Sequence, residues 1–190
     1  MASASLEPAS RGPVRDGWQR WRIVMWGGAA TLLALPLVAM QFTREVAWDG
    51  SDFLAMGCLL AAACGVVEFG MRRSRDLRYR AAACVAVLAG LLLVWANLAV
   101  GVIGDGANAA NLAIFGVPLV ALVGACVARF RAHGMAITLA ATAATQAVFL
   151  PLALRAEDDA AIVPIGVFVA LWLVSAALFW SAARARQGRA

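Results

Sequence analysis

The chain of 190 residues is 63% hydrophobic and only 14% charged, with a mean hydropathy of +0.81. Soluble domains have about 25% charged and 45–50% apolar residues, so this composition excludes an ordinary soluble protein and predicts an integral membrane protein. The net charge is +5 and all 16 basic residues are arginine. Because these arginines flank apolar spans, we expect them to orient the chain in a membrane and expect no nucleic-acid partner.

Six stretches of the sequence approach or exceed the length that a helix needs to cross a bilayer. About 18–20 mainly apolar residues cover ~30 Å of hydrocarbon, because each residue of a helix advances by about 1.5 Å. None of the stretches alternates polar and apolar residues as the strands of a membrane barrel do. We therefore predict an all-α fold, a polytopic membrane helix bundle of six transmembrane helices.

In chain order, residues 1–17 are rich in Ser, Pro, Gly and charge and predict a disordered cytoplasmic tail. Residues 18–183 form the predicted membrane domain, and residues 184–190 form a second cytoplasmic tail. A signal peptide is the alternative for the first span, but the long preceding tail and the lack of a cleavage site favour a retained helix. The predicted spans are 23–42, 53–71, 81–103, 112–128, 135–154 and 161–183.

The positions of the arginines predict the orientation of the spans. Fourteen of the 16 lie in the tails, beside the first span or after the second and fourth spans, whereas Arg44 and Arg155 lie in the other connections. Because positive charge near a span resists translocation, both termini are expected in the cytoplasm, with the chain in a bacterial inner membrane. The lipid bilayer is then the first partner, and the cytoplasmic arginines are expected to contact anionic lipid headgroups.

Small residues predict how the spans pack, because membrane helices associate through close approach of their backbones. In the span 81–103, small residues recur at steps of three, four and seven, so the amide of Asn97 is expected to face protein. A similar stripe in the span 53–71 places Glu68 on an interior face. We interpret residues 81–111 as the packing core of the bundle. The first stripe consists of Ala83, Ala86, Gly90, Asn97, Gly101 and Gly104.

Acids and amides gather on the side of the membrane opposite the arginines. Carboxylate and amide oxygens are ligands that cations prefer, so one hypothesis is a site for a small cation, a proton or a polar solute at the periplasmic mouth. The alternative is that the loop acids cap helix N-termini and that Asn97 makes an interhelical hydrogen bond, for example with Gln146. The candidate polar cluster consists of Asp49, Asp52, Asn97, Asp105, Asn108 and Gln146.

Glu68 is the only acid within a predicted span. Arg72 follows it by four residues, and side chains at this spacing meet on one face of a helix. Glu68 also lies only about one helical turn from the predicted cytoplasmic edge. We therefore predict an ion pair between Glu68 and Arg72 rather than a transport site.

The reactive residues do not favour an enzyme. The only histidine, His133, cannot form a bis-histidine haem site, and the sequence has no HExxH or GxxxxGK[ST] motif. All four cysteines lie in apolar spans without a CxxC pair, which favours free thiols over disulfides or metal ligands. No catalytic residue, cofactor or metal is therefore predicted.

Much of residues 41–150 consists of four segments: REVAWDGSDFLAMG, YRAAACVAVLAGLLLVWANLAVGVIG, GDGANAAN with NLAIFG, and ARFRAHGMA. Together they resemble a family of small, uncharacterised bacterial inner-membrane proteins. The resemblance implies a polytopic membrane architecture and no particular function. The loop GDGANAAN is less acidic than the corresponding loop of that family, which weakens the case for a cation there.

The sequence is consistent with two functions of different kinds. The first is a non-enzymatic inner-membrane protein that acts as an accessory factor or a subunit. The second is a small transporter or channel that uses the candidate polar cluster, as an oligomer, because six short helices enclose little room for a pathway. The sequence does not specify whether a partner is a second copy of the chain or another membrane protein.

Overall fold

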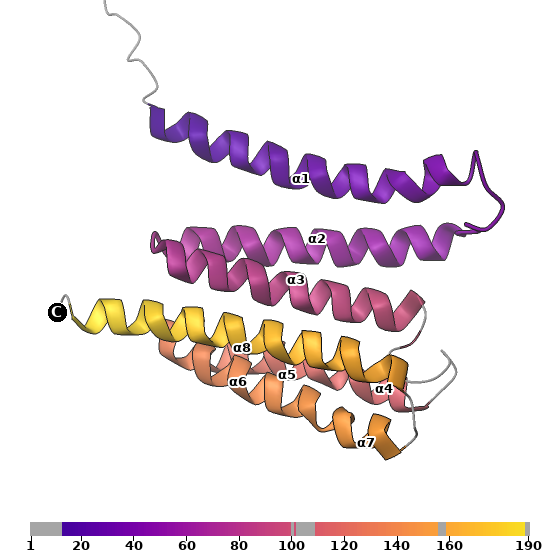
Figure 1. Ribbon diagram of the computed structural model, residues 1–190. Helices are drawn as coiled ribbons and strands as arrows, with labels where there is room; N and C mark the ends of the chain where they lie inside the picture. Colours follow the sequence, from indigo (N-terminus) through magenta and orange to yellow (C-terminus); the bar gives the residue numbers. More distant parts are fainter. Residues whose placement is uncertain (1–12, 100, 102–108, 156–158, 189–190) are drawn as a thin grey trace, which may run out of the picture. The chain divides into compact units, whose positions relative to one another are not determined.

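The structure is a computed structural model that describes residues 13–99, 101, 109–155 and 159–188 (Figure 1). Helices joined by short connections account for these residues, and none of them lies in a strand. The predicted all-α class is therefore confirmed for the described part of the chain. The chain divides into two compact units, Met1–Gly57 and Cys58–Ala190.

The first unit contains α1 (Pro13–Ala39) and the first two turns of α2 (Gly50–Arg73). Helix α1 begins within the tail that the sequence predicts to be disordered, and its first residue is a proline, which suits the first turn because no N–H is needed there. Within this unit, a Cβ atom at Gly57 would lie 3.6 Å from the Leu33 side chain, an ordinary packing contact.

The second unit contains the rest of α2 and six further helices. Helix α8 lies between α3 and α6 and contacts both, together with the short α7 (Figure 1). The other helices are α3 (Leu77–Ala99), α4 (Ala109–Ile114), α5 (Gly116–Val127), α6 (Ala132–Ala147), α7 (Phe149–Arg155) and α8 (Asp159–Gln187).

Helix α8 forms the centre of the buried core. Its buried side chains recur at every third or fourth position, the spacing that places residues on one face of a helix. The Ser175 hydroxyl adds a polar link, because it donates a hydrogen bond of 2.7 Å to the Ala82 carbonyl of α3. The buried apolar residues of α8 include Ile165, Phe168, Trp172, Phe179 and Ala182.

Helix α3 buries Asn97, as its small-residue stripe predicts, but most of its buried face is rotated away from that stripe. Ala82, Ala89 and Leu93 are fully buried, whereas Ala83, Ala86 and Gly90 are only partly buried and line a groove. Small side chains here leave space beside α2 instead of closing it. A close approach occurs only locally: a Cβ atom at Gly70 of α2 would lie 3.2 Å from the Ala83 Cβ atom.

Two predicted spans are each broken into two helices. The span 112–128 is divided at Phe115, between α4 and α5, and the span 135–154 is divided at Val148, between α6 and α7. Each break lies next to the carbonyl four residues before a proline, Pro118 in one case and Pro151 in the other. Because proline has no N–H, that carbonyl loses its helical hydrogen bond.

The turn between α5 and α6 is tightly built. Phe130 N–H donates to the Ala125 carbonyl at 3.1 Å and Arg129 N–H donates to the Cys126 carbonyl at 3.0 Å, the pattern of a Schellman motif. Arg129 and Phe130 both have positive φ angles, 49° and 56°. The helices then meet closely, because a Cβ atom at Gly124 would lie 2.4 Å from the Thr138 side chain.

Among the described residues, five helices are long and apolar enough to cross a membrane, and one apolar helix is shorter. The predicted spans agree with these helices to within a few residues at most ends, and α8 continues to Gln187, into the predicted second tail. The five are Trp18–Ala39, Gly50–Arg73, Leu77–Ala99, Ala132–Leu154 and Ala161–Gln187, and the shorter one is Asn111–Val127. Here α6 and α7 count together as Ala132–Leu154, and α4 and α5 count together as Asn111–Val127.

Candidate functional site

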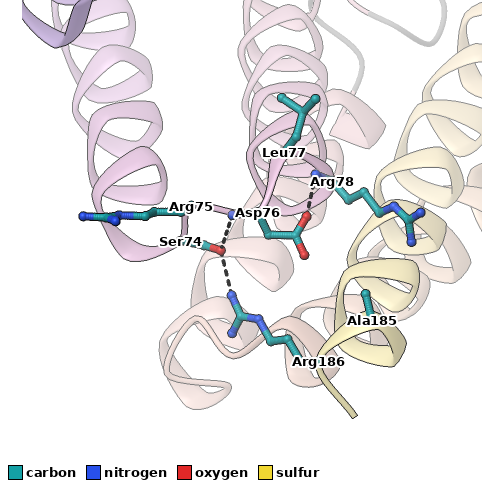
Figure 2. Close-up of a pocket in the computed structure, with 7 residues that line it drawn as sticks. All are labelled: Ser74, Arg75, Asp76, Leu77, Arg78, Ala185 and Arg186. Carbon is teal, nitrogen blue, oxygen red and sulfur yellow. Dashed lines mark hydrogen bonds between the residues drawn. The ribbon is translucent and has the colours of Figure 1, made fainter. Parts of the chain in front are cut away.

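The connection between α2 and α3 is anchored by Ser74, whose side chain is buried. Its hydroxyl oxygen accepts hydrogen bonds from the Asp76 backbone N–H at 3.1 Å and from Nη2 of Arg186 at 2.7 Å (Figure 2). Arg186 lies in the last turn of α8. One serine therefore joins the connection to a helix that begins 85 residues later in the chain.

Two further side chains, Asp76 of the connection and Arg80 of α3, satisfy the ends of the helices. Arg80 donates from Nε to the Ser74 carbonyl at 2.8 Å and from Nη2 to the Met71 carbonyl at 3.1 Å. The Asp76 carboxylate accepts from the Arg78 backbone N–H at 2.8 Å, as an N-cap residue does. Both arrangements match the helix dipoles, with a cation at the end of α2 and an anion at the start of α3.

Tyr79 lies in the first turn of α3 and is 2% exposed. Its hydroxyl donates to the Phe130 carbonyl at 2.8 Å, which ties α3 to the turn between α5 and α6. Its ring meets Phe179 edge to face at a centroid distance of 4.9 Å. The Arg186 guanidinium lies 5.7 Å from the centroid of the Tyr79 ring, a cation–π contact.

A pocket of about 560 Å³, which we call the arginine pocket, lies between the α2–α3 connection, the start of α3 and the end of α8 (Figure 2). Arg186 uses one N–H for Ser74, and its other N–H groups, like the Arg75 and Arg78 side chains, have no hydrogen-bond partner among the described residues. Asp76 is the only acid in the lining, so the pocket carries excess positive charge. The pocket is lined by Ser74, Arg75, Asp76, Leu77, Arg78, Ala185 and Arg186.

A second cavity, the apolar groove, has a volume of about 340 Å³ and is lined by residues of α2, α3, α5, α6, α8 and the turn at Phe130. Tyr79 and Phe179 line it at the arginine-rich end of the bundle, and Leu59 and Val94 line it far from that end. The two cavities share no lining residue, but Arg186 of the arginine pocket lies over the ring of Tyr79, which lines the groove, so a side chain of each cavity contacts the other.

The acids predicted for the periplasmic mouth cap a helix where the structure describes them. The Asp49 carboxylate accepts from the backbone N–H of Asp52 at 3.0 Å, and the Asp52 carboxylate accepts from the backbone N–H of Asp49 at 3.0 Å. This reciprocal pair is a capping box at the start of α2. Hydrogen bonds from the Ser51 hydroxyl and from the backbone N–H groups of Asp52 and Ser51 lower the pKa of Asp49.

The two amides of the candidate polar cluster do not bond to each other. Asn97 is buried and donates from Nδ2 to the Asn111 carbonyl at 2.8 Å. Gln146 is fully buried, and neither of its amide atoms has a hydrogen-bond partner among the described residues. The structure therefore does not contain the expected Asn97–Gln146 bond. Asp105 and Asn108 lie outside the described residues.

The structure brings Glu68 and Arg72 together as an ion pair within α2. The Glu68 side chain is 12% exposed, whereas that of Arg72 is 60% exposed. The Glu68 carboxylate is therefore mostly buried, whereas the Arg72 guanidinium extends outward, as a long basic side chain does near the end of a membrane helix.

The residues that organise the arginine-rich end were not singled out by the sequence. The segment RRSRDLRYR indicates a charge cluster that orients the chain in the membrane, and Arg186 lies in a segment predicted to be a tail. One signal was present: Tyr79 is the only tyrosine in the chain and interrupts a run of arginines. A tyrosine has an apolar body and a polar tip, which suits a boundary between a polar pocket and an apolar core.

The described residues contain no candidate metal site. No group of three or more His, Cys, Asp or Glu side chains gathers among the residues that the structure describes. The four cysteines are free thiols. No family model, no curated protein and no solved structure matches this chain.

Proposed function

We propose that the chain is a multi-pass protein of a bacterial inner membrane, with six crossings and both termini in the cytoplasm. The observation that carries this proposal is that, among the described residues, five helices are long and apolar enough to cross a bilayer. The shorter helix Asn111–Val127 supplies the sixth crossing, because it covers about 25 Å, close to the lower limit for a span.

The distribution of arginine supports the orientation. The arginine pocket lies at the end of the bundle where α2 ends, α3 begins and α8 ends, and we place this end on the cytoplasmic side. The capping box of Asp49 and Asp52 lies at the other end of α2, so we place it on the periplasmic side.

The proposed role is that of an accessory factor or a subunit without chemistry of its own. Ser74, Tyr79 and Arg80 are engaged in hydrogen bonds that hold elements together. Large apolar side chains on the outer faces of α5 and α8, such as Leu122 and Val174, are more than half exposed and are available to lipid or to a partner helix.

Reporter fusions test the proposed topology. We expect alkaline phosphatase to be active when fused after residue 47 or 158, and green fluorescent protein to be fluorescent when fused after residue 75, 131 or 190. Each reporter serves as the control for the other, because each is active on one side of the membrane only. A periplasmic C-terminus together with a cytoplasmic N-terminus would contradict six crossings.

A second candidate function, transport of a cation, a proton or a polar solute, is favoured by one observation. The fully buried amide of Gln146 has no partner among the described residues, and an amide inside a span is a candidate transport residue. Flux into liposomes that is lost in Asp52→Asn and Asn97→Ala variants would support transport. Absence of flux for protons and common cations would count against it.

A further inference from the structure

We infer that the arginine pocket and the apolar groove form one binding site for an anionic phospholipid, with the phosphate at Arg78 and Arg186 and one acyl chain in the groove. The inference rests on the proposed function, because a lipid of this kind reaches the site only when the bundle lies in a membrane. The juxtaposition that carries it is Tyr79, which lines the groove and holds Arg186 above its ring.

The pocket has the donors that a phosphate needs. A guanidinium presents five N–H groups in a planar fork, and arginine favours phosphate because two of these groups can bond two oxygens at once. Ser74 and the Tyr79 ring fix the position of Arg186 while using only one of its donors. Arg78 lines the same pocket with a guanidinium that has no partner among the described residues.

The groove has the dimensions of one hydrocarbon chain. On α3 it runs from Tyr79 to Val94, a rise of about 22 Å. Its volume of about 340 Å³ is spread along that length, so the groove is long and narrow, as an extended acyl chain is. The groove also extends somewhat beyond the ~15 Å depth of one leaflet.

The groove is open along its side. Val66, Phe69 and Leu122 line it and are 41%, 46% and 56% exposed, so an acyl chain can enter from the bilayer without unfolding the bundle. At the arginine-rich end, the headgroup would then lie where the helices meet the aqueous phase. A phospholipid matches both cavities at once.

A helix is too wide for the same space. A helix with its side chains is at least about 10 Å across, whereas the groove has a volume of only about 340 Å³ along the buried length of α3. This difference argues against a helix of a second copy as the occupant. A free phosphate would fill the pocket alone and would leave the groove without a ligand.

Native mass spectrometry of the purified full chain in detergent tests the site. The probes are phosphatidylglycerol and phosphatidylcholine with the same acyl chains. We expect one phosphatidylglycerol retained per chain, with phosphatidylcholine at least tenfold weaker. The double variant Arg78→Gln, Arg186→Gln should weaken phosphatidylglycerol binding by about 25-fold, because each basic side chain near an anionic lipid contributes about fivefold.

Two controls isolate the pocket and the groove. Arg131→Gln removes an exposed arginine outside the pocket and should change binding by less than twofold. Ala86→Leu fills the groove and should weaken both lipids alike, whereas Ala144→Leu adds the same bulk on the exposed face of α6 and should not. Should the double variant fail to fold, the comparison of the two lipids on the wild-type chain still decides.

Several results would overturn the inference. Equal retention of the two lipids, or an equal loss in Arg131→Gln, would show that no specific headgroup site exists. Displacement of phosphatidylglycerol by millimolar inorganic phosphate, with no effect of Ala86→Leu, would show an ion site alone. A change in oligomeric mass in Ala86→Leu without loss of lipid would show a protein occupant. Negative lipid results with fusions that report six crossings would refute only the site.

Discussion

The arginine-rich end of the bundle is held by side-chain hydrogen bonds that join two elements. They are made by Ser74, Tyr79 and Arg80. Gln146, buried within α6, has two amide atoms without a partner among the described residues. Both regions place polar groups away from water, and only the first offsets the cost of doing so. A buried polar atom left unpaired costs about 1–3 kcal/mol.

Comparing the arginine-rich end with Gln146 shows where polar side chains hold this bundle together. At the arginine-rich end, polar contacts fix the helix ends and leave the outward guanidinium donors available to a ligand. In α6 the amide of Gln146 contributes no such contact, so it either costs stability or meets a water or solute. Variants in the two regions should therefore change stability in opposite directions.

Tyr79→Ala should have the largest effect. It removes the hydroxyl bond to Phe130, the edge-to-face contact with Phe179 and the cation–π contact with Arg186. Truncating a buried aromatic side chain costs about 3–5 kcal/mol. The free energy of unfolding in detergent measures it, and Tyr79→Phe, which loses only the hydroxyl, should cost about 1 kcal/mol. Equal costs for both variants would show that ring packing at this position does not matter.

Gln146→Met should have the opposite sign. Methionine has a similar length without the amide, so the variant should gain about 1–3 kcal/mol by removing two unpaired buried atoms. The thermal midpoint in detergent is the measurement. Thr142→Val, at a buried neighbouring position whose hydroxyl donates to the Thr138 carbonyl, is the control and should bring no such gain. A less stable Gln146→Met would show that the amide has a partner and would favour transport.

Asn97→Ala tests the intermediate case, because among the described residues the amide nitrogen has a partner and the amide oxygen has none. Loss of the bond to the Asn111 carbonyl should cost about 1 kcal/mol, in line with hydrogen bonds inside membranes. Leu98→Ala, at the exposed next position, is the matched control for helix propensity. A gain in stability, as expected for Gln146→Met, would show that the Asn97 amide costs stability as the Gln146 amide does.

The smallest effect concerns the exposed capping box at the start of α2. The pKa of Asp49 lies below its usual value near 3.8, so the cap stabilises the helix at higher pH and is lost as the pH falls through the lowered pKa. The Ser51 and Asp52 amide resonances should therefore shift only below about pH 4. Asp49→Asn keeps a capping side chain without the charge and should remove this transition.

Local patterns in the sequence predict much of the architecture. The apolar runs predict the helices, and the four-residue spacing of Glu68 and Arg72 is sufficient to expect their contact, because one helical turn determines it. The breaks at Pro118 and Pro151 follow from the missing N–H group, but proline in a membrane helix need not break it, as Pro36 in the continuous α1 shows.

The arginine-rich end could not be predicted in the same way. The Ser74–Arg186 bond joins residues 112 positions apart, and the Tyr79 hydroxyl reaches a carbonyl 51 positions away. No periodicity in the sequence indicates contacts between residues so far apart. The sequence also predicts a packing face for the stripe of Ala83, Ala86 and Gly90, where the structure has a groove. Small residues allow either a closely packed helix or an open groove, and only the tertiary structure decides between them.

Photocrosslinking with a phosphatidylglycerol that carries a diazirine on one acyl chain tests whether that chain lies in the apolar groove. The crosslinked peptides of the full chain, identified by mass spectrometry, should concentrate on the groove-lining faces of α2 and α3, between Leu59 and Gly70 and between Ala83 and Val94. Labelling there should fall in the Arg78→Gln, Arg186→Gln variant. Labels distributed equally over outward positions such as Leu173 and Val174, and unchanged in that variant, would contradict the account.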